Sequence, residues 1–136
     1  MNEIWSRFEA LEECYEFMLA YAAQGLATDE GSAAGTQVKE VLKRASTALS
    51  GLAESCATAI QNEPDKQRDA MLQFLAILDR DAFDSLAAVK LVLAQPIISS
   101  QLIDNLNASI HLRALLTDIF LIGEVVKNRS QSLGAT

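Results

Sequence analysis

The feature that most constrains the fold is an uninterrupted seven-residue pattern of apolar and small residues between positions 38 and 59. These residues recur at alternating spacings of four and three, which places them on one face of a helix. They are Val38, Leu42, Ala45, Leu49, Leu52, Cys56 and Ala59. A helix with one apolar face must bury that face against other elements, so the pattern predicts helices packed side by side.

Three further segments of the chain carry the same periodicity. In the N-terminal segment the apolar face consists of Ile4, Phe8, Leu11, Tyr15, Met18 and Ala22. In the third segment it consists of Met71, Leu75, Leu78, Ala82, Val89 and Val92, with Ser85 as a polar exception. In the last segment it consists of Ala108, Leu112, Leu115, Leu116, Ile119, Ile122 and Val126. We therefore predict helices over about 2–25, 36–61, 64–94 and 99–128.

Turn and capping residues separate these four segments. Gly25 suits the end of the first helix, and the glycine-rich stretch from about 25 to 36 indicates a flexible polar loop. Thr36 suits the N-cap of the second helix, and Pro64 suits the first turn of the third. Asp81 could cap a new start within the third helix, which would interrupt it there.

The spacing of the segments predicts how the helices are arranged. Long helices joined by short loops pack antiparallel against their neighbours. A chain of 136 residues suffices for one domain, and because aromatic residues make up only 6% of it, Leu, Ile, Val and Ala must build the core. We expect a single all-α domain, 1–136, folded as an antiparallel up-down-up-down four-helix bundle. Because the last helix is apolar over much of its circumference, we also expect a homodimer.

The charge of the chain argues against two classes of partner. A formal net charge of −7 at pH 7 is opposite to the basic surface that binds nucleic-acid phosphates or anionic lipids. The longest apolar stretch, ALLTDIFLIGEVV, contains Thr117, Asp118 and Glu124 and is shorter than the roughly 20 residues of a membrane-spanning helix. The first residues lack the basic start and apolar run of a secretory signal. We expect a cytoplasmic protein that binds neither nucleic acid nor membrane, with Cys14 and Cys56 as reduced thiols.

The only histidine of the chain, His111, lies midway between Asp104 and Asp118 at intervals of seven residues. A rotation of roughly 100° per residue places all three inside the apolar face of the last helix. Buried polar groups need partners, so we expect this buried polar line to meet Tyr15 of the first helix and Ser85 of the third. The line could fix the register of a bundle or dimer, or could bind a small ligand.

Metal binding and catalysis fit the sequence poorly. Helical bundles that bind two irons use Glu-x-x-His pairs, whereas Ala108 and Ala114 stand three residues either side of His111. A pair of Cys56 and His111 would need an oxyanion hole, which a continuous helix face does not offer. The loop glycines form no phosphate-binding motif. We expect no enzyme activity, no cofactor and no metal, with a small-ligand or metal site on the buried polar line as an alternative.

The stretch HLRALLTDI contains a Leu-Arg pair, a Leu-Thr pair and a final isoleucine, at Leu112, Arg113, Leu116, Thr117 and Ile119. This spacing resembles the phosphoacceptor segment of two-component histidine kinases, H-E-L-R-x-P-L-T-x-I, which lies on a helix of a dimeric four-helix bundle. Here the histidine stands one residue closer to the Leu-Arg pair, and Leu115 replaces the proline. The chain is also similar to histidine-phosphotransfer domains in being a helical bundle with a single histidine. The resemblance implies a second alternative, a phosphotransfer or signalling domain that uses His111.

The sequence favours a non-catalytic helical bundle that acts through protein contacts, as an adaptor, regulator or assembly factor. Large apolar and aromatic side chains at the edges of the helix faces are the candidates for such contacts. The interface candidates are Phe17, Tyr21, Phe120 and Leu121.

Overall fold

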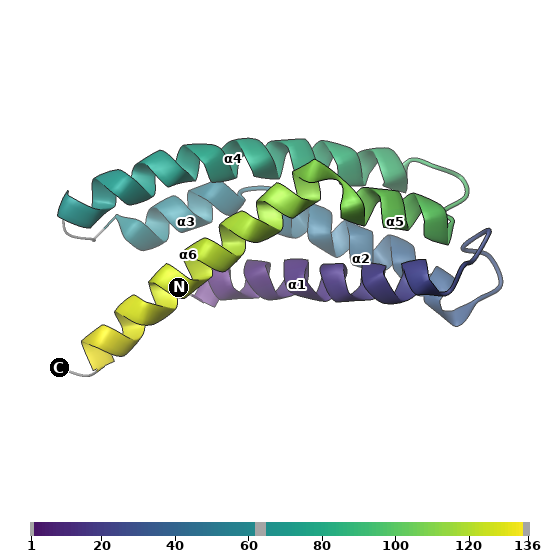
Figure 1. The fold of residues 1–136 in the computed structure, drawn as a ribbon, viewed down its shortest axis with the longest axis horizontal. Helices are drawn as coiled ribbons and strands as arrows, with labels where there is room; N and C mark the ends of the chain where they lie inside the picture. Colours follow the sequence, from purple (N-terminus) through teal and green to yellow (C-terminus); the bar gives the residue numbers. More distant parts are fainter. Residues whose placement is uncertain (1, 62–64, 135–136) are drawn as a thin grey trace.

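The chain is all-helical, as predicted, in a computed structural model that describes residues 2–61 and 65–134 (Figure 1). Its helices are α1 (Asn2–Ala23), α2 (Ala33–Leu49), α3 (Leu52–Ile60), α4 (Asp65–Leu93), α5 (Ser100–Ala108) and α6 (Ile110–Gly134). The pair α2 and α3 follow one another end to end, as do α5 and α6, and most of the helices lie lengthwise along one axis (Figure 1). Within the described ranges, no helix combines the length and the apolar character needed to cross a membrane.

The predicted helix over 36–61 is wrong in one respect, because it is divided into α2 and α3. Ser50 is extended, with φ −68° and ψ 116°, and Gly51 has a left-handed φ of 80°. Glycine adopts that conformation without the steric cost that a Cβ atom would bring. The backbone therefore turns at Gly51 while the apolar pattern continues through it, with Leu49 and Leu52 both buried.

Arg7 of α1 satisfies the carbonyl groups left free where α2 ends. Its Nη1 atom donates hydrogen bonds to the backbone oxygens of Thr47, Ala48 and Ser50 at 3.1, 2.9 and 2.6 Å. Its Nη2 atom lies 3.1 Å from a carboxylate oxygen of Glu3, one turn earlier on α1. The last carbonyls of a helix have no partner within the helix, so a cation placed there both bonds them and offsets the negative end of the helix dipole.

The predicted helix over 99–128 is also divided, at Ser109. This residue is extended, with φ −62° and ψ 147°, and its N–H donates to the oxygen of Leu106 in α5. Its hydroxyl oxygen accepts from the N–H of Leu112 at 3.3 Å, as an N-cap does. Ser109 thus ends α5 and starts α6, which gives the two helices different directions.

Two capping predictions need correction. Ser32, and not Thr36, caps α2, because its hydroxyl oxygen accepts from the N–H of Gly35 at 2.9 Å. Thr36 lies within the first turn of the helix and bonds the carbonyl of Ala33 instead. Asp81 starts no new helix, since α4 runs unbroken from Asp65 to Leu93.

A polar clasp joins the loop after α1 to the loop before α5. The Ser100 hydroxyl donates to the oxygen of Tyr21 at 2.6 Å and accepts from the N–H of Leu26 at 2.8 Å. The Tyr21 hydroxyl donates to the oxygen of Ile98 at 2.6 Å, and the N–H of Ile98 donates to the Asp29 carboxylate at 2.9 Å. The stretch expected to be a flexible loop is therefore anchored at two points, Leu26 and Asp29.

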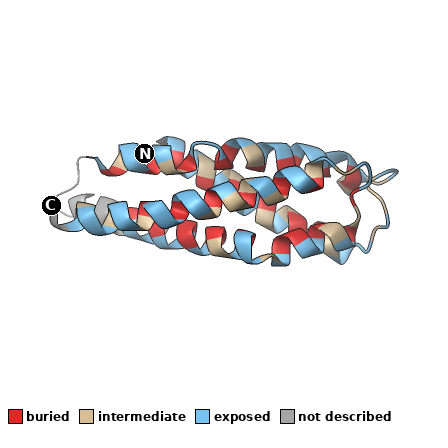
Figure 2. Ribbon diagram, turned by 90° about the horizontal axis from the view of Figure 1, so that it is seen from above, coloured by how far each residue is buried: buried red, intermediate tan, exposed pale blue. Residues whose placement is uncertain are grey.

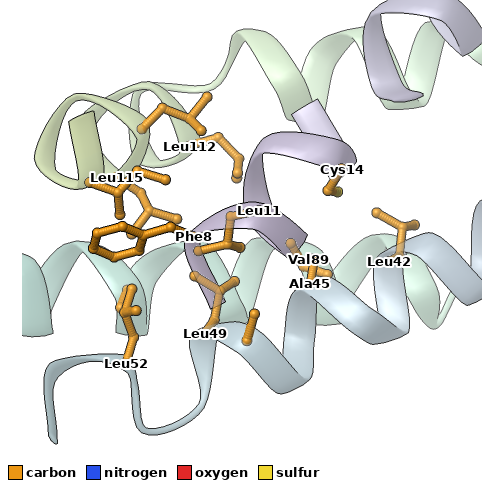
Figure 3. Close-up of a cluster of buried hydrophobic side chains, with 14 of the residues drawn as sticks. Phe8, Leu11, Cys14, Leu42, Ala45, Leu49, Leu52, Val89, Leu112 and Leu115 are labelled. Atoms are coloured by element: carbon orange, nitrogen blue, oxygen red, sulfur yellow. The ribbon is translucent and has the colours of Figure 1, made fainter. Parts of the chain in front are cut away.

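The core is one continuous cluster of buried side chains on the inner sides of the helices (Figure 2). In its centre, Phe8 and Leu11 of α1 lie among residues from α2, α3 and α6, which include Leu49, Leu52 and Leu115 (Figure 3). The helices α4 and α6 pack against each other, and α1 packs against α2 and α5. Aliphatic side chains dominate this core, as the low aromatic content predicts.

Replacing Arg7 tests the cap at the end of α2. We expect Arg7→Ala to lower the free energy of unfolding by about 1–3 kcal/mol, because the partly buried oxygen of Ala48 and the exposed oxygens of Thr47 and Ser50 lose a charged donor. Arg44→Ala is the matched control: its side chain is 62% exposed and pairs with Glu13 at 3.7 Å. An exposed pair of this kind contributes less than about 1 kcal/mol. Urea denaturation of both variants measures the difference, and equal losses would contradict the role of Arg7.

Candidate functional site

Asp104, His111 and Asp118 do not form the buried polar line that the sequence predicts. Asp118 is buried, with 5% of its surface exposed, but Asp104 and His111 are exposed. The break at Ser109 explains this result. On α5 the buried face is set by Ile103, Leu106 and Asn107, which turns Asp104 outward, and His111 lies in the first turn of α6, where its side chain remains open to solvent.

The partners expected for the line have different roles. Ser85 of α4 is fully buried and does reach His111, but its hydroxyl donates to the backbone oxygen of His111, at 2.9 Å, and not to the imidazole. Tyr15 is half-buried and packs against the core. Asn107, which the sequence reasoning missed, is buried near the end of α5, and its side-chain oxygen accepts no hydrogen bond.

A second carboxyl group, that of Asp81 on α4, lies near Asp118. The negative charge of Asp81 acts on Asp118, whose Oδ2 atom is buried without a partner. A neighbouring carboxylate disfavours the charged form of a buried carboxyl group. Asp81 was considered only as a helix cap, although it stands three residues after Leu78 and four before Ser85, which is the spacing of the apolar face itself.

Burial and the second carboxyl change the acidity of Asp118. Loss of solvation raises its pKa to about 8, and the negative charge of Asp81 acts in the same direction. Both causes oppose the charged form, as in other pairs of carboxyl groups that share a site. Burial and the neighbouring carboxylate therefore favour the neutral form of Asp118 near neutral pH.

Neither a metal site nor a reactive thiol arises from the residues that the structure describes. Within the described ranges, no three His, Cys, Asp or Glu side chains gather closely enough to hold a metal ion. Both cysteines are free and buried in the core. Burial raises the pKa of Cys14 to about 12 and that of Cys56 to about 11, so both remain protonated thiols and weak nucleophiles.

An apolar groove of about 620 Å³ lies between α3, α4 and α6. Its walls include Cys56 and Ile60 of α3, Met71 and Phe74 of α4, and Leu121 and Val125 of α6. The volume is within the range of roughly 300–1,000 Å³ typical of ligand pockets. The lining is almost entirely apolar, so the groove suits an apolar side chain or ligand and not a charged substrate.

The middle of α6 exposes large apolar side chains beside this groove. Phe120 and Leu121 are 52% and 53% exposed, and Val125 is also exposed. Trp5 of α1, which is 38% exposed, approaches α6 at Gly123, where its ring would lie 3.7 Å from an added Cβ atom. We call Trp5, Phe120, Leu121 and Val125 the α6 surface.

The other two interface candidates lie elsewhere. Tyr21 is wrong as a contact residue, because it is completely buried and its hydroxyl belongs to the polar clasp. Phe17 is half-buried and stacks on Tyr21, with ring centroids 6.0 Å apart. Aromatic residues at the edge of a helix face can turn inward when a backbone acceptor lies within reach, here the oxygen of Ile98.

Asp118→Asn tests whether the buried Asp118 carboxyl holds a proton. Because the folded pKa of about 8 lies above the usual 3.8, the native state keeps a proton that the unfolded chain releases. The free energy of unfolding should therefore fall as pH rises from about 4 to 8, by up to about 1.4 kcal/mol per pH unit. The Asn amide carries no charge at any pH, so the variant should lose this slope and be more stable at pH 8, on the order of 2 kcal/mol. Denaturation at several pH values measures it, and parallel curves would contradict the neutral form of Asp118.

Comparison with known proteins assigns no family to this chain. It matches no protein-family model, no curated protein and no solved structure. The candidate sites therefore stand on the geometry of the described residues alone, and these sites are the Asp81–Asp118 pair, the apolar groove and the α6 surface.

Proposed function

We propose that this protein is a non-catalytic, cytoplasmic helical bundle that acts through protein contacts, as an adaptor, regulator or assembly factor, and that it forms a homodimer. In this proposal α2 with α3, and α5 with α6, act as single segments, so that the helices of the described ranges make up an up-down-up-down bundle of four segments. The observation that carries the proposal is the apolar groove bordered by the α6 surface.

Exposing the apolar side chains of the α6 surface to water is unfavourable in free energy. Burying one large apolar side chain completely contributes roughly 1.5–3 kcal/mol relative to leaving it exposed. Phe120, Leu121 and Val125 are each about half exposed, and they occupy neighbouring positions on one helix. A partner that covers them gains part of that free energy from each residue, which favours an interface at this end of α6.

The same region contains both the apolar groove and apolar side chains that project beside it. Leu121 and Val125 form one wall of the groove and also project from its edge, and Phe120 lies on the adjoining side of α6. A twofold dimer uses the same patch on both copies, so a patch of this kind must be complementary to itself. The exposed apolar side chains of α6 in one copy can enter the groove of the other copy. We therefore propose a second copy of this chain as the partner.

Sedimentation or light scattering at micromolar concentration tests the homodimer. We expect a mass of twice 14.7 kDa, favoured by added salt because each copy carries a net charge of −7. Leu121→Glu should give a monomer, since it places a charge in the interface. Leu91→Glu on α4, where the native side chain is 66% exposed, is the matched control and should remain dimeric. A monomeric wild-type protein, or a dimeric Leu121→Glu variant, would argue against this interface.

Phosphotransfer through His111 is a second candidate, and the observation that favours it is the exposed imidazole. An exposed histidine on a helix is accessible to a phosphate donor, whereas a buried one is not. Incubation with phosphoramidate or a histidine kinase should then yield acid-labile phosphate on the wild-type protein and none on His111→Gln. No labelling under either condition would remove this candidate. The alternative of a ligand site made from Asp104, His111 and Asp118 lacks support, because only Asp118 faces the interior.

A further inference from the structure

We infer that the apolar groove between α3, α4 and α6 binds an uncharged small molecule built mainly of hydrocarbon. The groove has a volume of about 620 Å³, within the range typical of pockets for small ligands. It is distinct from Asp104, His111 and Asp118, and its walls all belong to one chain. A ligand here goes beyond the protein contacts proposed above and does not depend on them.

The groove lies where α1 no longer fills the space between the other helices. Figure 1 shows that α1 begins beside the middle of α6, whereas α4 and α6 continue further toward that end of the molecule. In the centre of the core, Phe8 and Leu11 of α1 occupy this space (Figure 3). In the groove, α1 contributes Ile4, from its first turn, to the lining. An occupant of the groove therefore takes the place that α1 side chains fill elsewhere.

The groove has a buried floor and an exposed rim. Cys56 and Ile60 of α3 and Val126 of α6 line it and are buried, so they belong to the hydrophobic core. Ala70 of α4 and Leu121 of α6 also line it and are exposed. A molecule in the groove thus lies against the core and gains dispersion contacts with side chains that have no partner on that side when the groove is empty.

The chemistry of the lining selects an uncharged ligand. None of the described residues that line the groove carries a charge, and Gln67, which is exposed, supplies its one amide. The Cys56 thiol remains neutral, because burial raises its pKa to about 11. A charged group among these side chains would lose its hydration without gaining an ionic partner. Met71 has a flexible side chain that can adapt to the shape of a ligand.

The extent of the walls favours a small molecule over a helix of a partner protein. The α6 wall runs from Leu121 to Val126, which is about 8 Å at the rise of an α-helix. A docked amphipathic helix uses anchors from position i to i+7, which span about 10.5 Å. The α6 wall is shorter than this span, so the groove suits a compact chain or ring system.

Two related fluorescent probes and two variants test the inference. N-phenylnaphthylamine is uncharged and becomes brighter in apolar surroundings, and anilinonaphthalene sulfonate carries the same ring systems with one added negative charge. Ala70→Phe places a ring in the groove. Ala87→Phe makes the same change on α4 at an exposed residue outside the lining, so it is the matched control. Because both alanines are exposed, both variants should fold, which far-UV circular dichroism checks.

We expect saturable binding of N-phenylnaphthylamine, one molecule per chain, and binding of the sulfonate that is weaker by at least about tenfold. Ala87→Phe should keep the wild-type affinity. Ala70→Phe should lower it by at least about tenfold, because the added ring fills the groove. No saturable binding by the wild-type protein, an equal or higher affinity for the sulfonate, or an unchanged affinity of Ala70→Phe would overturn the inference.

The mass of the same dilute samples, measured by sedimentation, separates this result from the proposed homodimer. A second copy would place its side chains in the same groove, so the ligand and the second copy compete. A monomer that binds the probe supports the ligand site and contradicts only the dimer. A dimer that binds no probe at the lowest protein concentration contradicts the ligand site and leaves the dimer standing.

Discussion

The packing of α6 on α4, which buries the Asp118 carboxyl beside the partly exposed Asp81, is the interaction on which the arrangement of α6 depends. Apolar side chains such as Leu78, Leu115 and Ile119 can pack in more than one register, because burial alone has little directional preference. Burying a polar group in the same interface costs free energy in every helix register except the one in which it finds a hydrogen-bond partner. The bond from Ser85 to the backbone of His111 therefore helps to fix how α6 lies on α4.

The position of α6 in turn creates the surfaces that a partner or ligand could use. One side of α6 closes the core through Leu115, Ile119 and Ile122, and another forms a wall of the apolar groove. The remaining side exposes Phe120 and Leu121 to solvent. A single helix thus contributes to the core, the groove and the exposed α6 surface, and a change in its position would alter the last two while much of the core stays intact.

The helical periodicity of the sequence was sufficient to predict the all-α fold and the approximate start of α1, α4 and α5. It could not predict that two helices are broken, because the apolar pattern continues across each break. The signals were present but local: Gly51 interrupts a helical segment, and Ser109 is a residue that favours caps. The role of Arg7 at the end of α2 depends on residues about forty positions away, so no local pattern could indicate it.

The candidate site was only partly predictable for the same reason. The helical rotation placed Asp118 on the apolar face, where it lies in the structure, but it assumed one continuous helix and so misplaced Asp104 and His111. Asp81 was not identified as the neighbour of Asp118, because contact between helices requires knowledge of their relative positions. The spacing from Leu78 to Asp81 to Ser85 was the one indication that Asp81 faces inward.

The central claim of this account is that burial, together with the neighbouring Asp81 carboxyl, keeps the buried Asp118 carboxyl neutral near neutral pH. A ¹³C NMR titration of the Asp side-chain carboxyl groups tests it most directly, with Asp81 and Asp118 identified by their Asn variants. The account predicts that the Asp118 resonance titrates near pH 8, because burial and the negative charge of Asp81 both raise its pKa. Titration of Asp118 near pH 4, as for an ordinary aspartate, would contradict the burial of this carboxyl and with it the explanation of how α6 packs on α4.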